Sequence, residues 1–287
     1  MRRSPVTWLL PLGTMVQFFL PRWAVLPVAR FAGTVAFFLN HGQRKRVLEN
    51  LRHVLGAGAS EKTIARTARQ TFVNLVIGYL DLMRGPVLKR RIVNWTEYRP
   101  GNLEAALKFG RGAILVTGHV GNWDLAAIFM TAYGYPLSAV VEPIPAGWTE
   151  TFNRYRCLAE MEAIPIPERR KIADAIKRRR LLALVADRDL TGNGVVCPSF
   201  DSHRSFPRGP AAYALKYGLP VVVGCYVLQD RPGHRPYYGE VNPALEFQPT
   251  GDMARDIEDF TRLIARCLDD LVRRYPDQWF AFRAGWL

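Results

Sequence analysis

Four short apolar runs, separated by segments with helical periodicity, constrain the fold of this chain more than any other feature. They occupy residues 113–117, 137–141, 181–186 and 220–227. Strands that are buried on both faces are almost continuously apolar, because helices cover both sides of a parallel sheet. The pattern therefore predicts an α/β fold with a mostly parallel central sheet flanked by helices, and 287 residues are enough to bury such a sheet.

Three longer segments have the apolar spacing of amphipathic helices. One covers residues 43–55. A second begins after Ser60, a favourable helix cap, and ends at Gly85 and Pro86. The third runs over residues 252–274. No Pro-, Gly- or Ser-rich linker divides the chain, so we expect these helices to accompany one α/β domain.

The N-terminal section is apolar and contains two tryptophans. Residues 4–21 carry no charge, although Pro11 and Gly13 interrupt them, and Trp8 and Trp23 lie near arginines. This combination is typical of helices that lie in a membrane interface, and no A-x-A-like cleavage site follows it. The alternative is a buried N-terminal helical hairpin. We expect apolar, membrane-associating helices in residues 1–56 and the α/β domain in residues 57–287.

The formal net charge of +14 arises from short runs of basic residues. Such a surface attracts nucleic acid, anionic lipid headgroups or a phosphorylated carrier, although each run could equally be a solvated surface. A nucleic-acid-binding protein has no use for the apolar N-terminus. We therefore expect membrane lipids as partners and no nucleic acid. The four cysteines are scattered without a CxxC pair, which indicates free thiols rather than disulfides or a zinc site.

A histidine follows the first apolar run at once. His119 lies where the strand over residues 113–117 ends, and ligands of open α/β sheets bind at the carboxyl ends of strands. Asn122 is a good cap for a helix that follows. On a continuous helix, His119 and Asp124 would point ~140° apart. Gly118 and Gly121 allow a turn that brings the two side chains together.

Such a pair can act as a general base and its orienting carboxylate. Asp124 would accept a hydrogen bond from one imidazole nitrogen of His119, and the other nitrogen would accept a proton from a hydroxyl. Backbone amides of the turn could stabilise the oxyanion. No serine or cysteine nucleophile and no metal is then needed. The alternative is a histidine that serves only as a cap or a hydrogen-bonding group.

The segment from His119 to Asp124 matches the HxxxxD signature of glycerolipid acyltransferases. Nearly the whole chain resembles the lipid A lauroyl/myristoyl acyltransferase family of that superfamily, with supporting segments at residues 46–51, 186–190, 207–211 and 276–279. The Asp-Arg-Asp sequence at residues 187–189 is similar to the phosphatidylinositol mannoside acyltransferase branch. Glu160 and the apolar residues 195–198 depart from the family pattern.

The resemblance implies a membrane-associated O-acyltransferase that moves a fatty acyl chain from acyl-CoA or acyl carrier protein to a glycolipid hydroxyl. The expected acceptor is a phosphatidylinositol mannoside, with a lipid A-type precursor as the alternative. The implied catalytic residues are His119, Asp124 and Glu142. The implied substrate-binding residues are Asn122, Trp123, Arg156, Asp187, Arg188, Asp189, Arg208 and Gly209.

The same resemblance implies no cofactor beyond the thioester co-substrate and no metal. It places the protein at the cytoplasmic face of the plasma (inner) membrane, either peripheral or with one N-terminal anchor. A rival interpretation is a non-catalytic lipid-binding protein that kept the fold. Replacing His119 separates the two, because only an enzyme depends on that imidazole for acyl transfer.

Several of the implied residues also have a purely structural interpretation. Glu142 could be a surface residue at a strand end, and Arg156 a solvated helix residue. Asp187 and Asp189 could bind a sugar hydroxyl or could simply begin the turn that follows them. The backbone amides at residues 208–209 could hold an anionic headgroup at a helix N-terminus.

Overall fold

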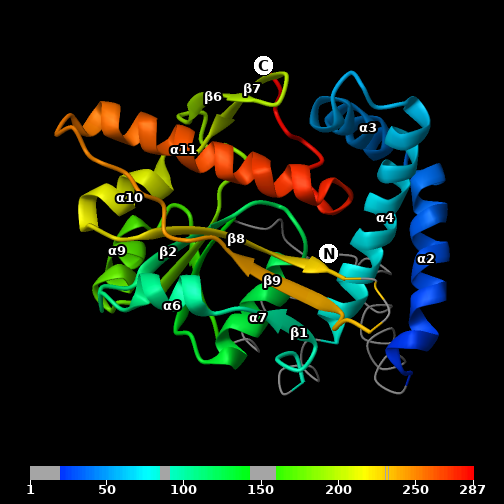
Figure 1. The fold of residues 1–287 in the computed structure, drawn as a ribbon, viewed down its shortest axis with the longest axis horizontal. Coiled ribbons are helices and arrows are strands. Elements are labelled where there is room, and N and C mark those ends of the chain that lie inside the picture. The colour runs from blue at the N-terminus through cyan, green and yellow to red at the C-terminus, as the bar shows by residue number, and fades with distance from the viewer. Residues whose placement is uncertain (1–19, 85–90, 143–159, 230, 232) are drawn as a thin grey trace, which may run out of the picture.

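A seven-stranded sheet forms the centre of the protein (Figure 1). The computed structural model describes residues 20–84, 91–142, 160–229, 231 and 233–287. All neighbouring strands are parallel except β8 and β9, which are antiparallel. The predicted α/β fold with a mostly parallel sheet is therefore confirmed. In spatial order, the strands are β1 (Thr96–Tyr98), β9 (Tyr237–Val241), β8 (Val221–Leu228), β2 (Ala113–Thr117), β5 (Leu181–Val185), β3 (Leu137–Val141) and β4 (Glu162–Pro165).

Helices cover both faces of the sheet, which explains why the central strands are apolar throughout. Alternate residues of β2 belong to different cores: Ile114 and Val116 pack into one core and Leu115 into the other. The first core includes α9 (Arg169–Lys177), α10 (Gly209–Tyr217) and α11 (Met253–Arg274). The second includes α6 (Gly101–Leu107) and α7 (Trp123–Tyr133). Complete burial of each large aliphatic side chain contributes ~1.5–3 kcal/mol to the free energy of unfolding.

The N-terminal helices lie together at one side of the sheet (Figure 1). They are α2 (Arg22–Leu39), α3 (His41–Leu55) and α4 (Glu61–Met83). Helix α2 packs closely on α4, where a Cβ at Gly33 would lie 2.5 Å from the Cα of Val73. The opposite face of α2 exposes large apolar side chains, and the helix is long and apolar enough to cross a membrane. The other apolar residues expected near the N-terminus, including Trp8, lie outside the described residues.

The predicted helices occur where the sequence places them. Helix α3 ends at Leu55, as expected, and Ser60 caps α4 by accepting a hydrogen bond from the Thr63 amide. Helix α11 begins after Asp252, whose side chain accepts hydrogen bonds from the amides of the first turn. The expected end of α4 at Gly85 and Pro86 lies outside the described residues, and the described part of the helix ends at Met83.

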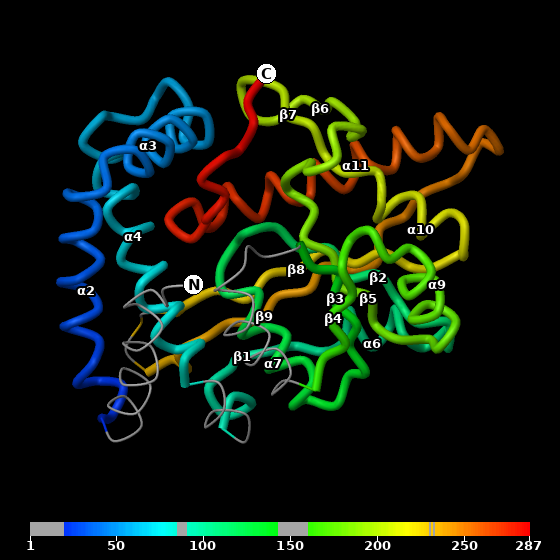
Figure 2. The backbone as a smooth tube through the Cα atoms, turned by 180° about the vertical axis from the view of Figure 1, so that it is seen from behind, coloured from blue at the N-terminus to red at the C-terminus, as the bar shows by residue number. Residues whose placement is uncertain are grey.

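The sequence did not predict the hairpin of β6 (Val195–Ser199) and β7 (Ser202–Phe206), because both strands are short and carry polar residues. Figure 2 shows the C-terminal segment after α11 passing between α3 and this hairpin. Hydrogen bonds attach the segment on both sides: Trp286 donates to Asn50 of α3, and Ser202 donates to the backbone of Leu287. The chain end is therefore held between α3 and the hairpin.

Candidate functional site

The carboxyl ends of adjacent parallel strands bring the candidate residues together. Strands β2 and β5 pair in register, with Thr117 opposite Val185. His119 and Asp187 each lie two residues beyond this pair, so they meet just past the edge of the sheet although 68 residues separate them. Glu142 follows the neighbouring strand β3 directly. This edge is where open α/β sheets bind ligands.

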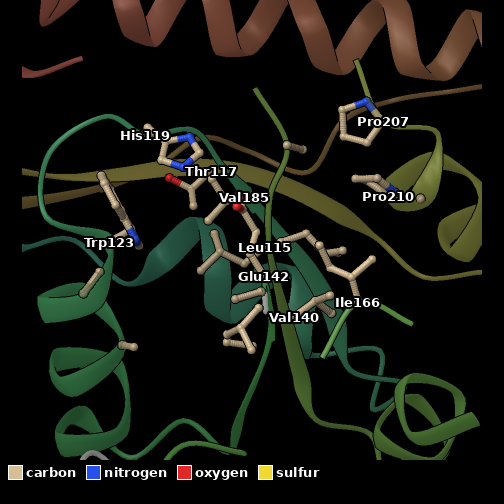
Figure 3. A pocket seen from close by; sticks show the side chains of 18 of the residues that line it. Leu115, Thr117, His119, Trp123, Val140, Glu142, Ile166, Val185, Pro207 and Pro210 are labelled. Atoms are coloured by element: carbon tan, nitrogen blue, oxygen red, sulfur yellow. The ribbon is translucent and has the colours of Figure 1, made fainter. Parts of the chain in front are cut away.

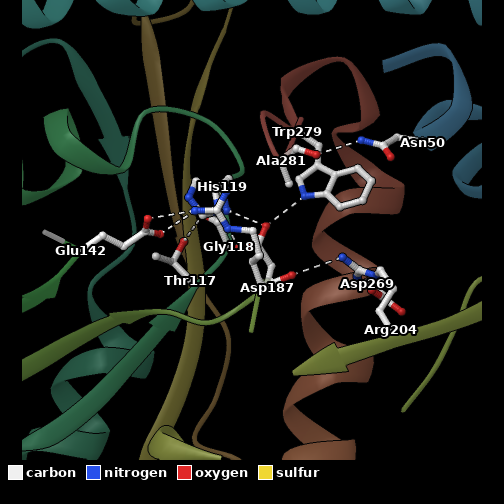
Figure 4. Close-up of polar contacts among 11 residues, drawn as sticks. Asn50, Thr117, Gly118, His119, Glu142, Asp187, Arg204, Asp269, Trp279 and Ala281 are labelled. Atoms are coloured by element: carbon white, nitrogen blue, oxygen red, sulfur yellow. Dashed lines mark hydrogen bonds and ion pairs between the residues drawn. The ribbon is translucent and has the colours of Figure 1, made fainter. Parts of the chain in front are cut away.

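Asp187 holds the imidazole of His119 (Figure 4). Its Oδ1 lies 2.7 Å from His119 Nδ1, and its Oδ2 accepts a hydrogen bond from the His119 backbone amide at 2.9 Å. The side chain of Asp187 is fully buried, and that of His119 is 17% exposed. A carboxylate at Nδ1 keeps the proton on that nitrogen, which leaves Nε2 as the acceptor of the neutral ring.

Trp279 and Arg204 hold Asp187 in place. Trp279 Nε1 donates to Asp187 Oδ2 at 3.0 Å, and Arg204 donates to the Asp187 carbonyl oxygen at 3.3 Å. Arg204 is itself fully buried and pairs with Asp269 at 2.5 Å. Its guanidinium lies over the rings of Phe206, Trp279 and Trp286. No pattern in the sequence indicated a role for Arg204, and the signal at Trp279 was limited to the family-like segment that ends there.

The turn that carries His119 leaves no room for a side chain at Gly121 and little room at Gly118. Gly121 has a φ of +70°, and a Cβ there would collide with the carbonyl oxygen of Tyr226. A Cβ at Gly118 would lie 3.1 Å from Asp187 Oδ2. Only glycine at position 121 therefore allows the loop to approach β8, and glycine at position 118 lets the loop lie close to the buried carboxylate.

The expectation that amides of this turn stabilise an oxyanion is wrong for three of them. The amide of His119 donates to Asp187, that of Gly121 to the Gln278 carbonyl at 2.8 Å, and that of Asn122 to the Tyr226 carbonyl at 2.7 Å. These bonds attach the turn to β8 and to the C-terminal segment. The amides serve to position the loop and are not available to a ligand.

The pKa values of the pair shift in opposite directions. Burial by itself lowers the pKa of His119, but the charge of Asp187 and its hydrogen bond outweigh burial and raise that pKa above its ordinary value. Burial by itself raises the pKa of Asp187, but the charge and hydrogen bonds of His119 and the bond from Trp279 hold it well below its ordinary value. Asp187 therefore stays ionised, and His119 keeps its proton to a higher pH than a free histidine.

His119 Nδ1 is hydrogen-bonded to Asp187, not to Asp124 as the HxxxxD spacing predicted. Asp124 lies in the first turn of α7 and lines the cavity described below, where its charge, after burial, contributes to raising the pKa of Tyr79. The helix begins at Trp123 and carries Asp124 with it, whereas β5 ends directly beside the imidazole. The expected contact of Asp187 with a substrate hydroxyl is also wrong, because this carboxylate is fully buried.

Asn122 and Trp123 form the wall beside His119. Asn122 is the predicted cap of α7: its Oδ1 accepts from the Leu125 amide at 3.0 Å, and its Nδ2 donates to the Gly78 carbonyl of α4 at 2.9 Å. The ring of Trp123 meets the His119 ring edge to face, with centroids 4.9 Å apart. Both residues line the cavity. Their predicted contact with substrate stays a prediction.

Glu142 and Arg188 form an ion pair at the opening of the site. Arg188 Nη2 donates to both carboxylate oxygens of Glu142, at 2.8 and 2.9 Å. Both side chains are half-buried and line the cavity. The negative charge of Glu142 contributes to the raised pKa of His119, after the larger effects of burial and Asp187, and the charge of Arg188 opposes it. The two residues thus act on the imidazole through charge.

Asp189 has the structural role that the sequence left open as an alternative. Its carboxylate accepts hydrogen bonds from the amides of Thr191 and Gly194 and from the Ser205 hydroxyl. Burial by itself raises the pKa of Asp189, but these bonds lower it below the ordinary value. The carboxylate is engaged by the turn that it begins, which is the role that Asp residues often have in turns.

The last predicted residues lie at the start of α10. Arg208 precedes the helix and Gly209 begins it, and both line the cavity. Arg208 donates to the Asn193 carbonyl at 3.0 Å and pairs with Glu258 at 3.2 Å. The predicted headgroup contact at these two residues stays a prediction. Arg156 lies outside the described residues.

A cavity of about 930 Å³ extends from His119 along the edge of the sheet (Figure 3). The lining residues from α4 and α7 are mostly apolar, whereas those from α9 and α10 include several cations. We call these two parts of the lining the apolar arm and the α9–α10 arm. This volume is large enough for a lipid chain. Apolar lining residues include Leu75, Leu82, Leu115, Ala127, Met130, Val140, Met161 and Ile166.

The arrangement suits proton transfer beside an apolar chain. An imidazole held at Nδ1 by a buried carboxylate can accept a proton at Nε2 from an alcohol in the cavity. Within the part of the chain that the structure describes, no group of three or more His, Cys, Asp or Glu side chains could hold a metal ion.

The chain is similar to known acyltransferases over its whole length. A phosphatidylinositol mannoside acyltransferase from Mycobacterium tuberculosis is 26% identical over 306 aligned positions, which cover 99% of this chain and 90% of the relative. A protein of the same name from Mycolicibacterium smegmatis is 29% identical over 193 positions, which cover 65% of this chain and 60% of the relative. A family model matches residues 1–287. The chain belongs to the bacterial lipid A biosynthesis acyltransferase family.

Proposed function

We propose that this acyltransferase transfers a fatty acyl chain from acyl-CoA or acyl carrier protein to a hydroxyl of a phosphatidylinositol mannoside-type glycolipid. One observation carries the proposal: the His119–Asp187 pair lies beside a largely apolar cavity of about 930 Å³. Reactive groups and a binding volume for a lipid are thus in one place. The names of the relatives favour this acceptor, and the name of the family makes a lipid A-type precursor the second candidate.

The imidazole of His119 is the general base in this mechanism. Its Nε2 removes the proton of the acceptor hydroxyl while the hydroxyl oxygen attacks the thioester carbonyl carbon. The tetrahedral intermediate then expels the thiolate, which receives the proton from the imidazolium. Asp187 fixes the ring through Nδ1 and stabilises the imidazolium that forms between the two steps. The thioester supplies a good leaving group, so the chain needs no nucleophile of its own.

The charged residues around the imidazole assist this chemistry. Burial disfavours the protonated ring, but the charge and hydrogen bond of Asp187 outweigh burial and strengthen the base. The charge of Glu142 acts in the same direction and offsets part of the opposing effect of Arg188. Helix α7 begins at Trp123, four residues after His119, and the positive end of its dipole favours the negative charge of the intermediate. The amides of His119, Gly121 and Asn122 in the preceding turn already donate to protein acceptors. Other groups of the site therefore stabilise this negative charge.

Helix α2 attaches the enzyme to a membrane in this proposal. Its outward face exposes Trp23 (75%), Phe31 (72%) and Leu39 (73%), while its inward face is held by packing on α4 and by the Arg22–Asp81 ion pair at 3.2 Å. An amphipathic helix of this kind lies in the interface with its apolar face among the acyl chains. The basic surface then faces anionic headgroups, as expected at the cytoplasmic face of the membrane.

Vesicle flotation tests the membrane attachment. Replacing Trp23 and Phe31 together by serine should reduce binding to vesicles that contain anionic phospholipid, because two large apolar side chains leave the outward face. Wild-type binding by this variant would show that α2 is not the attachment site.

The variant His119→Ala tests the proposed activity. We expect acyl transfer from palmitoyl-CoA to a total lipid extract to fall by roughly 10³ or more, because general-base catalysis contributes ~10²–10⁴ and the small residue cannot replace it. The thermal unfolding temperature and vesicle binding should stay close to those of the wild type. Mass spectrometry of the acylated product identifies the acceptor and separates the mannoside from the lipid A-type alternative. Equal transfer by wild type and variant would favour a non-catalytic lipid-binding protein.

A further inference from the structure

Three cations line the α9–α10 arm of the cavity without a carboxylate partner. Arg169 and Arg170 begin α9, and Lys216 lies in the last turn of α10. Among the residues that the structure describes, no Asp or Glu forms an ion pair with any of the three. Their neighbours differ: Lys171 pairs with Glu168 at 2.5 Å, and Arg208 pairs with Glu258. Arg208 and Arg188 also line the cavity, but each is neutralised by a glutamate, whereas the exposed side chains of Arg169, Arg170 and Lys216 are not.

The position of the two arginines is unfavourable for the helix itself. The first turn of α9 contains no acidic residue, and Glu168 at its N-cap makes no side-chain capping bond. Cations at a helix N-terminus add to the positive end of the helix dipole and destabilise the helix. Side chains, helix dipole and Lys216 thus concentrate positive potential in one arm of the cavity, and an anion there would be attracted by all of them.

The sheet gives an approximate separation between this arm and the imidazole. The strand order is β2, β5, β3, β4, and α9 follows β4 as His119 follows β2. Three strand spacings of ~4.8 Å place the ends of β2 and β4 ~14 Å apart. The pantetheine arm of an acyl-CoA joins its thioester to a phosphate through a chain equivalent to roughly four extended residues, or ~15 Å. The two lengths agree.

We propose that Arg169, Arg170 and Lys216 form a subsite for phosphate esters, and that its occupant is the phosphorylated end of the thioester donor. This rests on the proposed acyl transfer and specifies how the donor binds. Arginine guanidinium groups bind phosphate oxygens in pairs, and a lysine ammonium adds a third charge. With the phosphates in the α9–α10 arm, the pantetheine chain runs along the ends of β4, β3 and β5 toward His119, and the acyl chain continues into the apolar arm.

A phosphodiester of the acceptor lipid has the same chemistry and is the competing source of phosphate. A mannosylated inositol lipid carries a phosphate of its own. If that phosphate occupied the subsite, Arg169, Arg170 and Lys216 would determine the KM for the lipid acceptor. The donor is favoured by the match between the pantetheine length and the separation of the strand ends. Kinetics with donors that carry or lack phosphate distinguish the two sources.

The test compares palmitoyl-CoA with palmitoyl-pantetheine, which keeps the thioester but has no phosphate. We expect the double variant Arg169→Ala with Arg170→Ala to raise the KM for palmitoyl-CoA roughly ten- to hundredfold, the value of one or more charge-assisted hydrogen bonds. The KM for palmitoyl-pantetheine and for the lipid acceptor should not change. The double variant Arg169→Lys with Arg170→Lys should recover part of the loss. Lys177→Ala, on an exposed position of the same helix, is the matched control.

The outcomes are separable. An equal rise in KM for both donors, or no rise, overturns the subsite, and a rise confined to the lipid acceptor overturns the assignment to the donor. Calorimetry with adenosine 3′,5′-bisphosphate measures the subsite without catalysis. If wild type transfers no acyl chain but binds this probe, and the double alanine variant binds it at least tenfold more weakly, the subsite stands and the proposed function fails. Unfolding temperatures close to that of the wild type exclude a folding defect.

Discussion

The two ends of the cavity differ in how completely the protein satisfies its own polar groups. At the His119 end, both oxygens of Asp187 accept bonds from the protein, and Nδ1 of the imidazole is engaged. At the α9–α10 end, Arg169, Arg170 and Lys216 have no carboxylate partner among the described residues. The first end is organised before substrate arrives, as catalysis requires. The second leaves three exposed cations available to a ligand, as the proposed phosphate subsite requires.

The largest expected effect on activity comes from replacing Asp187, the carboxylate that holds His119. Asp187→Asn removes the charge that stabilises the imidazolium and allows the wrong tautomer. We expect kcat to fall by ~10⁴, as in comparable triads. Asp189→Asn is the matched control, because this carboxylate is two residues away and bonds to its own turn and to Ser205 but not to His119. Its effect on kcat should be smaller by at least tenfold. Similar losses in both variants would show that the segment acts as a whole and that Asp187 has no special role.

A smaller effect is expected from the residue that positions Asp187. Trp279→Phe keeps an aromatic ring but removes the hydrogen bond from Nε1 to Oδ2. Loss of one bond to a charged group corresponds to about a tenfold fall in kcat. The KM for palmitoyl-CoA should stay constant, because Trp279 does not line the cavity. A change in KM without a change in kcat would show that Trp279 contributes to binding of palmitoyl-CoA and not to the positioning of Asp187.

The smallest expected effect is a displacement of the pH profile. The pKa of His119 is raised, chiefly by Asp187 against the opposing effect of burial, and the base acts only when neutral. Transfer should therefore fall as pH drops, with a midpoint above the ordinary histidine value of ~6.5. In Asp187→Asn the residual activity should show a lower midpoint, because burial then dominates. The double alanine variant at Arg169 and Arg170 should keep the wild-type midpoint, because these residues are proposed to affect binding of the donor and not protonation of His119.

Local signals in the sequence were sufficient for most elements around the site. The strand before His119, the cap at Asn122 and the start of α7 were all predicted, because each depends on residues a few positions apart. The same holds for α4 after Ser60 and for α11. The β6–β7 hairpin was missed, because its short strands have no clear alternation of apolar and polar residues.

The partner of His119 could not be derived from local signals. The HxxxxD spacing pointed to Asp124, only five residues away, whereas the carboxylate at Nδ1 comes from a strand 68 residues later. Only the register of β2 with β5 places Asp187 there. Trp279 is more distant still, and its bond to Asp187 exists only because the C-terminal segment folds back over the sheet. Arg204 reaches the Asp187 carbonyl from the β6–β7 hairpin, and its partner Asp269 comes from α11.

The sequence by itself determined the α/β class, the position of the reactive histidine at the end of a buried strand and the family of the chain. These follow from apolar periodicity, turn chemistry and short motifs, which are all properties of neighbouring residues. The tertiary structure alone decided which carboxylate holds the imidazole, which amides are occupied and which cations face the cavity. Strand pairing brings together side chains that no local pattern connects, and the free energy of each contact depends on the burial that only the complete fold provides.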